Sequence, residues 1–418
     1  MRCRIVHAAD LHLDSPLVGL VRYEGAPVAE VRGATRRALE NLVQLCLDEG
    51  AQLLLLAGDL YDGDWRDYST GLFFAAQMAR LREGGTKVVW IRGNHDAQSK
   101  ITRHLSLGEH CVELSSKTPQ TFVHEACGVA VHGQGFFTPA VTEDLSAGYP
   151  APIKGLFNVG LLHTALSGRP GHAPYAPCDV RTLSARGYDY WALGHVHQRE
   201  VVSTEPYIVF PGNLQARHVR ETGAKGATLI TIEDGRVTKL EERALDVVRF
   251  AQLHVDATPA ESLGDVVQRV KADVRKALAA AEGRLLAARV HVVGASRAHA
   301  ELARDPERAR AEIQASANEI QGGDVWLEDV RFATEVALDQ AALAAREDAL
   351  GQLVRSLAAS EQDEELLRAL GDELSELMRV LPAELRDPEL GLDFSDPQNV
   401  RELLDSAKRQ LLPRLLGL

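Results

Sequence analysis

The chain has 418 residues, enough for two or three domains of about 100–200 residues each. Its composition, 45% hydrophobic and 25% charged, argues against a disordered, collagen-like or membrane-spanning protein. The formal net charge of −13 lies mainly in residues 251–418, which carry −11, so we expect no broad coating of nucleic acid, although one local basic groove is compatible with this balance.

Short apolar runs alternate with helical patterns in the first 200 residues. The helical spacing covers residues 33–49 and 69–83, and such alternation predicts a layered α/β sheet. Each apolar run ends in polar residues, at the position where open α/β sheets place their active sites. The predicted strands cover residues 5–9, 53–57, 87–92, 128–132, 158–163 and 190–193.

The rest of the chain divides into two further regions. A strand at 227–233 and a turn at 233–236 close the first domain, which we place at residues 1–245. Residues 246–335 predict a small α/β domain, with strands at 249–255, 285–293 and 325–332 and helices at 259–283 and 299–321. Residues 336–418 predict helices only.

Five polar motifs follow the predicted strands of the first domain. Alone, each is typical of a turn, a cap or an ordinary buried histidine, but five in succession at strand ends indicate one metal centre. Imidazole and carboxylate donors suit manganese, iron or zinc, and two such ions can share a bridging carboxylate. The motifs contain no cysteine, which disfavours a structural zinc site. They are Asp10-Leu11-His12, Gly58-Asp59-Leu60-Tyr61-Asp62, Gly93-Asn94-His95-Asp96, His163 and Gly194-His195-Val196-His197.

The order of these motifs resembles that of the calcineurin-like metallophosphoesterases. Within this family, the sequence resembles that of bacterial DNA-repair exonuclease subunits of the SbcD and YhaO type at residues 7–13, 57–62, 175–178, 192–197 and 211–213. The remainder is similar only in layout. The resemblance implies an α/β sandwich of two mixed sheets flanked by helices, followed by a small α/β capping domain and a helical C-terminal tail.

The resemblance also implies a ligand set for two divalent ions, with manganese expected. His95 would stay out of the coordination shell and serve the leaving oxygen as proton donor or transition-state stabiliser, while Asp96 would either orient His95 or cap a helix. Asp62 stands where archaeal and eukaryotic members have a histidine that helps to orient DNA, so its role is open. One ion would be held by Asp10, His12, Asp59 and His197, and the other by Asp59, Asn94, His163 and His195.

The function implied by the resemblance is a DNA nuclease that hydrolyses phosphodiesters with a metal-bridging hydroxide. It would be the nuclease subunit of a DNA-repair complex with an SMC-like ATPase of the SbcC/YhaN type. The partners would then be DNA and this ATPase. A homodimer is also possible under this reading, and no membrane partner is expected.

The residues expected to contact DNA are Tyr175, by stacking, and the basic cluster Arg217, His218 and Arg220, beside a glycine-rich loop at 167–172. The alternative is that Tyr175 anchors its loop and that the basic cluster is a solvated loop.

Two apolar stripes mark helices in the tail. The first begins near Ser360 and Asp363 and ends at Pro382, and the second begins at Asp396 and Pro397. The helices would either pack on each other or leave one apolar face for the ATPase. The stripes are Leu366, Leu370, Leu374, Leu377 and Leu381, and then Val400, Leu403, Leu404, Ala407, Leu411 and Leu415.

Two other classes of function compete with the nuclease. One is a phosphomonoesterase or small-molecule phosphodiesterase on the same fold, and the other is a scaffold that has lost catalysis. Phosphoprotein phosphatases typically have Arg-Gly after the second motif and Asn-His-Glu at the third, where this chain has Gly63-Asp64 and Asn94-His95-Asp96. Every expected ligand position is filled, which disfavours a scaffold.

The cysteine pattern and the start of the sequence favour the cytoplasm. There are five cysteines without a CxxC pair, and the start has no signal-peptide pattern.

Overall fold

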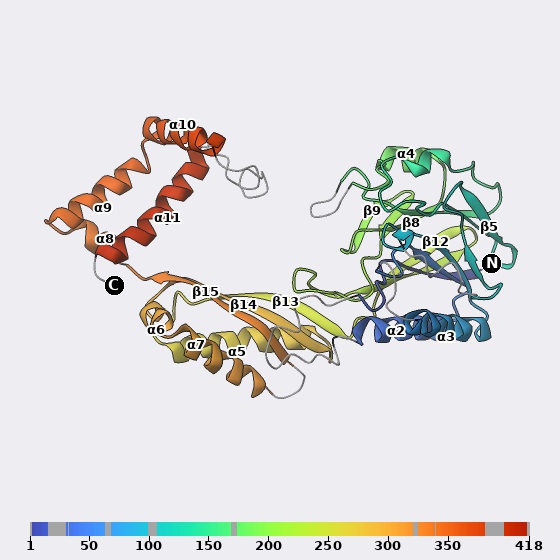
Figure 1. The fold of residues 1–418 in the computed structure, drawn as a ribbon, viewed down its shortest axis with the longest axis horizontal. Helices are drawn as coiled ribbons and strands as arrows, with labels where there is room; N and C mark the ends of the chain where they lie inside the picture. Colours follow the sequence, from blue (N-terminus) through green and yellow to red (C-terminus); the bar gives the residue numbers. More distant parts are fainter. Residues whose placement is uncertain are drawn as a thin grey trace. The chain divides into compact units, whose positions relative to one another are not determined.

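The computed structural model describes residues 2–15, 31, 33–62, 68–98, 107–168, 174–320, 325–338, 340–380 and 397–415. These residues form two six-stranded sheets, one three-stranded sheet and several helices (Figure 1). The chain divides into two compact units. The first comprises Met1–Gln252, Arg275–Arg289 and Ile320–Glu328, and the second Leu253–Val274, Val290–Glu319 and Asp329–Leu418. The division at residues 245 and 335 that the sequence suggests stays a prediction.

The first sheet has the strand order β12-β11-β1-β2-β3-β4. Its strands β1 to β4 run parallel, and β11 and β12 add antiparallel partners at the β1 side. Helices α2 (Ala34–Asp48) and α3 (Ser69–Glu83) connect the parallel strands. The strands are β1 (Arg2–Ala8), β2 (Leu53–Ala57), β3 (Lys87–Ile91), β4 (Cys111–Glu113), β11 (Gly226–Glu233) and β12 (Arg236–Ala244).

The second sheet has the order β5-β6-β7-β8-β10-β9. The four central strands are parallel, and the two edge strands β5 and β9 are antiparallel to their neighbours. A short helix, α4 (Val180–Ala185), precedes β8. The strands are β5 (Gln120–His124), β6 (Val129–Gly133), β7 (Phe157–His163), β8 (Tyr190–Gly194), β9 (Glu200–Thr204) and β10 (Tyr207–Phe210).

The strand β2 shows how these sheets are layered. Leu54 and Leu56 belong to a core shared with α2 and α3, whereas Leu53 and Leu55 belong to the core between the two sheets. Alternate residues of a strand point to opposite faces, so a strand covered on both sides needs an unbroken apolar run. On the far face of the second sheet, Trp191 packs with residues of α4 and β10. This order of helices, sheet, sheet and helix confirms the predicted sandwich.

The third sheet, β13-β14-β15, is accompanied by three helices. The sequence predicted one helix over 299–321, and this prediction is wrong, because the helix breaks at Asp305. The Asp305 side chain accepts the Arg308 N–H at 3.0 Å, and Pro306 starts a new helix without needing an N–H partner. The elements are β13 (Val248–Asp256), α5 (Leu263–Ala280), β14 (Leu285–Ser296), α6 (His299–Arg304), α7 (Pro306–Asn318) and β15 (Val325–Val336).

The C-terminal region is helical, as predicted. Asp363 alone caps α10, since it accepts the N–H groups of Glu365 and Leu366, whereas the predicted partner Ser360 bonds within α9. The predicted Leu381, Pro382 and Asp396, and the side chain of Leu377, lie outside the described residues. The helices are α8 (Gln340–Ala344), α9 (Ala349–Ser360), α10 (Glu364–Val380) and α11 (Pro397–Leu415).

The tail helices bury only part of their predicted apolar stripes. Of the predicted stripe residues, Val400 is buried, whereas the helices also bury Leu367 and Leu412, which the stripes did not include; Leu412 packs with residues of α8 and α9. Four leucines of the predicted stripes are exposed instead; they are Leu366, Leu403, Leu411 and Leu415, with exposed fractions of 38%, 41%, 43% and 53%. The described helices include none with the length and apolar character of a membrane span.

Candidate dinuclear metal site

The strand ends of both sheets carry the polar motifs. Because β1, β2 and β3 are parallel, Asp10, Asp59 and Asn94 follow them at one edge of the first sheet. His163 and His195 follow β7 and β8 at the corresponding edge of the second sheet. The Asp10 carboxylate accepts the His195 N–H at 3.0 Å, which joins the two edges directly. The sandwich therefore brings donors from five strands to one place.

Two motif glycines are required by close approach. A Cβ on Gly93 would lie 2.2 Å from Asp59 Oδ1, and a Cβ on Gly194 would lie 2.0 Å from the Ala57 carbonyl oxygen. Neither oxygen can move without disturbing a strand end. Glycine precedes Asn94 and His195 because the donor-bearing turns pass this close to each other.

The backbone at the site adopts unusual conformations. Asp10, His12, Asp59 and His195 have φ values of 52°, 42°, 52° and 98°, in the region that non-glycine residues rarely occupy. Such strain persists only where surrounding structure enforces it, and it concentrates at functional sites. Here all four of these residues are predicted metal donors.

One donor group consists of Asp10, His12 and His197. The Nε2 atoms of His12 and His197 lie 3.2 Å apart, and His197 Nε2 lies 3.9 Å from Asp10 Oδ1. Both ring nitrogens point at the same spot, which is the arrangement expected of ligands that converge on one cation.

The other donor group consists of Asp59, His163 and His195. Asn94 adds its Oδ1 at 3.0 Å from His163 Nε2. Asp59 Oδ2 lies 3.4 Å from His163 Nε2 and 3.9 Å from His12 Nε2, so one oxygen faces both groups. This is the position that a bridging carboxylate needs. All seven predicted ligands are thus brought together.

The charges of these buried groups are strongly coupled to their surroundings. Burial raises the pKa of the Asp10 carboxyl to about 6. Burial would also raise the pKa of Asp59, but the nearby histidines, His163 first, hold it well below its usual range. Burial opposes protonation of His163, yet Asp59 raises its pKa to about 9. Such perturbed, contacting groups mark functional sites, and this donor set fits two divalent cations.

His95 lies beside the donors, on a side chain that is 40% exposed. Its Nδ1 is 2.9 Å from Asp62 Oδ1, and its backbone N–H donates to Asp59 Oδ1 at 2.9 Å. The hydrogen bond to Asp62 raises the pKa of His95. Asp62, not Asp96, is therefore the carboxylate that orients His95.

Asp96 was expected either to orient His95 or to cap a helix, and its carboxylate instead joins two turns. Its carboxylate accepts the backbone N–H groups of Leu60, Tyr61 and Gly93 at 3.2, 3.0 and 3.0 Å. It therefore ties the turn after β2 to the turn after β3. These are the turns that carry Asp59 and Asn94, so the hydrogen bonds of Asp96 hold these two donors in position.

The four residues expected to contact DNA lie around the site in different ways. The ring of Tyr175 packs 5.5 Å from that of His195 and 6.4 Å from that of Phe136. Arg217 lies inside the site, with Nη1 3.1 Å from Asp62 Oδ2. His218 and Arg220 are exposed. The described residues of loop 167–172 are Ser167 and Gly168 only.

Sequence reasoning missed Glu221. Its Oε1 lies 2.6 Å from His197 Nδ1, and its Oε2 accepts the Asn213 amide N–H at 2.9 Å and the Arg217 backbone N–H at 2.8 Å. A single acidic residue in a basic loop gives no sequence signal of such a role. Only the fold brings Glu221 to the back of His197.

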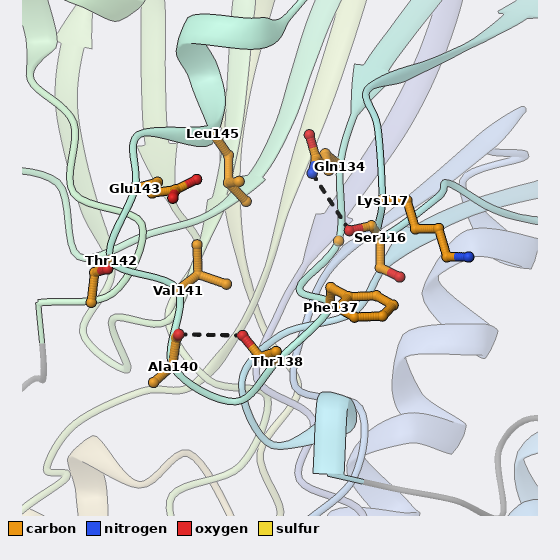
Figure 2. Close-up of a pocket in the computed structure, with 11 residues that line it drawn as sticks. Ser116, Lys117, Gln134, Phe137, Thr138, Ala140, Val141, Thr142, Glu143 and Leu145 are labelled. Carbon is orange, nitrogen blue, oxygen red and sulfur yellow. Dashed lines mark hydrogen bonds between the residues drawn. The ribbon is translucent and has the colours of Figure 1, made fainter.

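A pocket of about 470 Å³ lies next to the segment that follows β6 (Figure 2). Phe137 and Lys117 line it, with Lys117 Nζ 6.0 Å from the centre of the Phe137 ring. The metal donors are not among the residues that line this pocket. The preceding residue, Phe136, packs its ring 5.4 Å from that of His163, so the pocket segment is attached to the site.

Comparison with known families gives two matches. A model described as calcineurin-like phosphoesterase matches residues 3–199. A model described as the middle domain of the metallophosphoesterase YhaO matches residues 250–335.

Similar individual proteins include two curated relatives and a solved structure. The uncharacterized metallophosphoesterase YhaO of Bacillus subtilis is 37% identical over 270 residues, which are 64% of this chain and 66% of that protein. The DNA double-strand break repair protein Mre11 of Methanopyrus kandleri is 26% identical over 265 residues, 57% of this chain and 56% of that protein. The chain thus spans slightly less than two thirds of the first and about half of the second. The protein TT1561 of Thermus thermophilus is 16% identical with a TM-score of 0.34, over 59% of this chain and 100% of that one.

Proposed function

Since the chain carries a calcineurin-like metallophosphoesterase domain, we propose that it is a dinuclear-metal-dependent DNA nuclease that uses manganese. The observation that carries the proposal is the position of Asp59, whose Oδ2 faces both donor groups at 3.4 and 3.9 Å. The relative that is named as a DNA double-strand break repair protein supports DNA as the substrate. Exposed His218 and Arg220 near the donors would hold its phosphates.

The chain's own residues divide the work of phosphodiester hydrolysis. Two divalent cations, when bound, supply an acidified water and neutralise charge on the phosphate oxygens. His95 is held by Asp62 at the accessible side of the donors, where it donates a proton to the leaving oxygen. Its partner Asp62 favours the protonated imidazole, because the hydrogen bond raises the pKa of His95. The buried strand ends keep all these groups in fixed positions.

The substrate class is tested with purified protein and manganese. We expect cleavage of linear duplex or single-stranded DNA, and loss of cleavage when a chelator is added. The His163→Ala variant, purified in the same way, is the control for contaminating nucleases. It lacks one metal donor, so cleavage by this protein should fall, whereas cleavage by a contaminant would persist. If the protein cleaves a simple aryl phosphodiester or monoester but neither DNA, the alternative of a small-molecule phosphodiesterase or phosphomonoesterase replaces the nuclease.

We further propose that the tail helices bind an SMC-like ATPase in a DNA-repair complex. The support is a set of exposed leucines on α11, Leu403, Leu411 and Leu415, which are 41%, 43% and 53% exposed and follow one another at multiples of four residues. Helix-in-groove docking uses apolar side chains three or four residues apart, and Leu411 and Leu415 have this spacing. Acidic surroundings make this region a poor DNA binder by itself.

The tail proposal predicts the effect of introducing two negative charges among the exposed leucines of α11. The double variant Leu403→Glu and Leu411→Glu should lose co-elution with the host ATPase in size-exclusion chromatography. Manganese-dependent cleavage of short DNA should stay within about twofold, because exposed side chains outside a site rarely matter to it. The matched control is Leu72→Glu on α3, whose side chain is 64% exposed. Unchanged co-elution of the double variant would rule out these leucines as the docking element.

A further inference from the structure

The two histidines of the first donor group differ from His163 of the second in what lies behind the imidazole ring. In the first group, His12 Nδ1 lies 2.6 Å from Asp62 Oδ1, and His197 Nδ1 lies 2.6 Å from Glu221 Oε1. In the second group, His163 Nδ1 lies 2.8 Å from the neutral carbonyl oxygen of Ala57. A carboxylate behind an imidazole fixes the orientation of the ring and makes its other nitrogen a stronger ligand. Both histidines of the first group have this support.

One residue connects the two supporting carboxylates. The Arg217 backbone N–H donates to Glu221 Oε2 at 2.8 Å, and its Nη1 donates to Asp62 Oδ2 at 3.1 Å. The side chains of Arg217, Asp62 and Glu221 are 20%, 16% and 9% exposed, so solvent weakens these contacts little. Asn213 holds the same Glu221 oxygen from the other side at 2.9 Å. The segment 213–221 thus fixes both rings of the first group.

We propose that Arg217 and Glu221 are positioning residues that make the group of Asp10, His12 and His197 the tighter of two unequal metal sites. The inference rests on the proposed dinuclear function. Glu221 acts through His197, and Arg217 acts through Asp62 and His12, so neither residue touches the metal. At limiting metal, the first group fills before the group of His163 and His195.

Calorimetric titration of the metal-free full-length chain with manganese chloride tests this order. We expect two binding steps in the unmodified chain, and Glu221→Gln should weaken the tighter step about 10–100-fold while leaving the weaker step unchanged. Arg217→Ala should weaken the same step. The matched control is Glu241→Gln, because Glu241 pairs with Lys239 and Arg243 on β12.

A single-site background identifies the step. His163→Ala leaves the first group intact, so the one remaining step should be the tight one, and adding Glu221→Gln should weaken it. Circular dichroism without metal checks folding, and if Glu221→Gln does not fold, Arg217→Ala carries the test alone. Two equal sites in the unmodified chain, or a weakened second step in the variants, would overturn the inference. A chain that binds manganese in two unequal steps but leaves DNA intact would refute the nuclease and leave this inference standing.

Discussion

Replacing Asp59 with asparagine is expected to empty both metal sites and to abolish most activity. Asp59 Oδ2 faces His163 and His12 from one buried position, so its charge serves both donor groups. Without that charge, two cations about 3.5–4 Å apart would repel each other with less compensation. Since bound metal contributes several kcal/mol to such reactions, turnover should fall by about 10³-fold or more.

The measurement is metal content by elemental analysis together with calorimetric titration. Asparagine keeps an oxygen for the His95 backbone N–H, which Asp59 Oδ1 accepts at 2.9 Å, so the local turn should survive the change. His12→Ala is the comparison, because it removes a donor of the first group and should chiefly weaken one step. If Asp59→Asn and His12→Ala each weaken one step by the same amount, Asp59 does not bridge.

The sequence predicted most interior elements of the two large sheets closely because burial determines their composition, although it missed the interior strand β10. The leucine run of β2 and the bounds of α3 agree with the structure to the residue. The edge strands were missed for the opposite reason. β12, with the sequence RVTKLEERA, is mostly polar and is defined by its pairing with β11 rather than by its own pattern. The broken helix at Asp305 shows that a cap and a proline outweigh continuous helical spacing.

The sequence predicted only those parts of the site that are marked by a local motif, namely the metal donors. Strand ends of parallel sheets meet at one edge, so motifs placed after strands identify donors that converge. The residues behind the donors carry no such signal. Asp62 and Glu221 lie 50 and 24 residues from the histidines that they support, and Asp96 bonds backbone groups that no side-chain pattern reveals. Their roles follow from contacts between distant segments.

Replacing His95 with asparagine is expected to leave metal content nearly intact and to lower turnover by about 10²–10⁴-fold, the usual contribution of a proton donor. His95, His12 and Asp62 also form a third group of potential donors. A cation is nevertheless disfavoured there, since Arg217 Nη1 already lies 3.1 Å from Asp62 Oδ2 and brings its own positive charge. Loss of both metals from His95→Asn in elemental analysis would place His95 among the ligands instead.

The pH dependence of turnover separates the role of Asp62 from that of His95. A proton donor works in its protonated form, so turnover falls as pH rises through its pKa, and the Asp62 hydrogen bond raises that pKa. Asp62→Asn removes the negative charge that favours the imidazolium, so the alkaline limb of the profile should move to lower pH. His95→Asn should lose that limb altogether, because the imidazole that donates the proton is gone. An alkaline limb that stays in place in Asp62→Asn would mean that Asp62 merely packs beside His95, since a structural contact lowers turnover without moving its pH dependence.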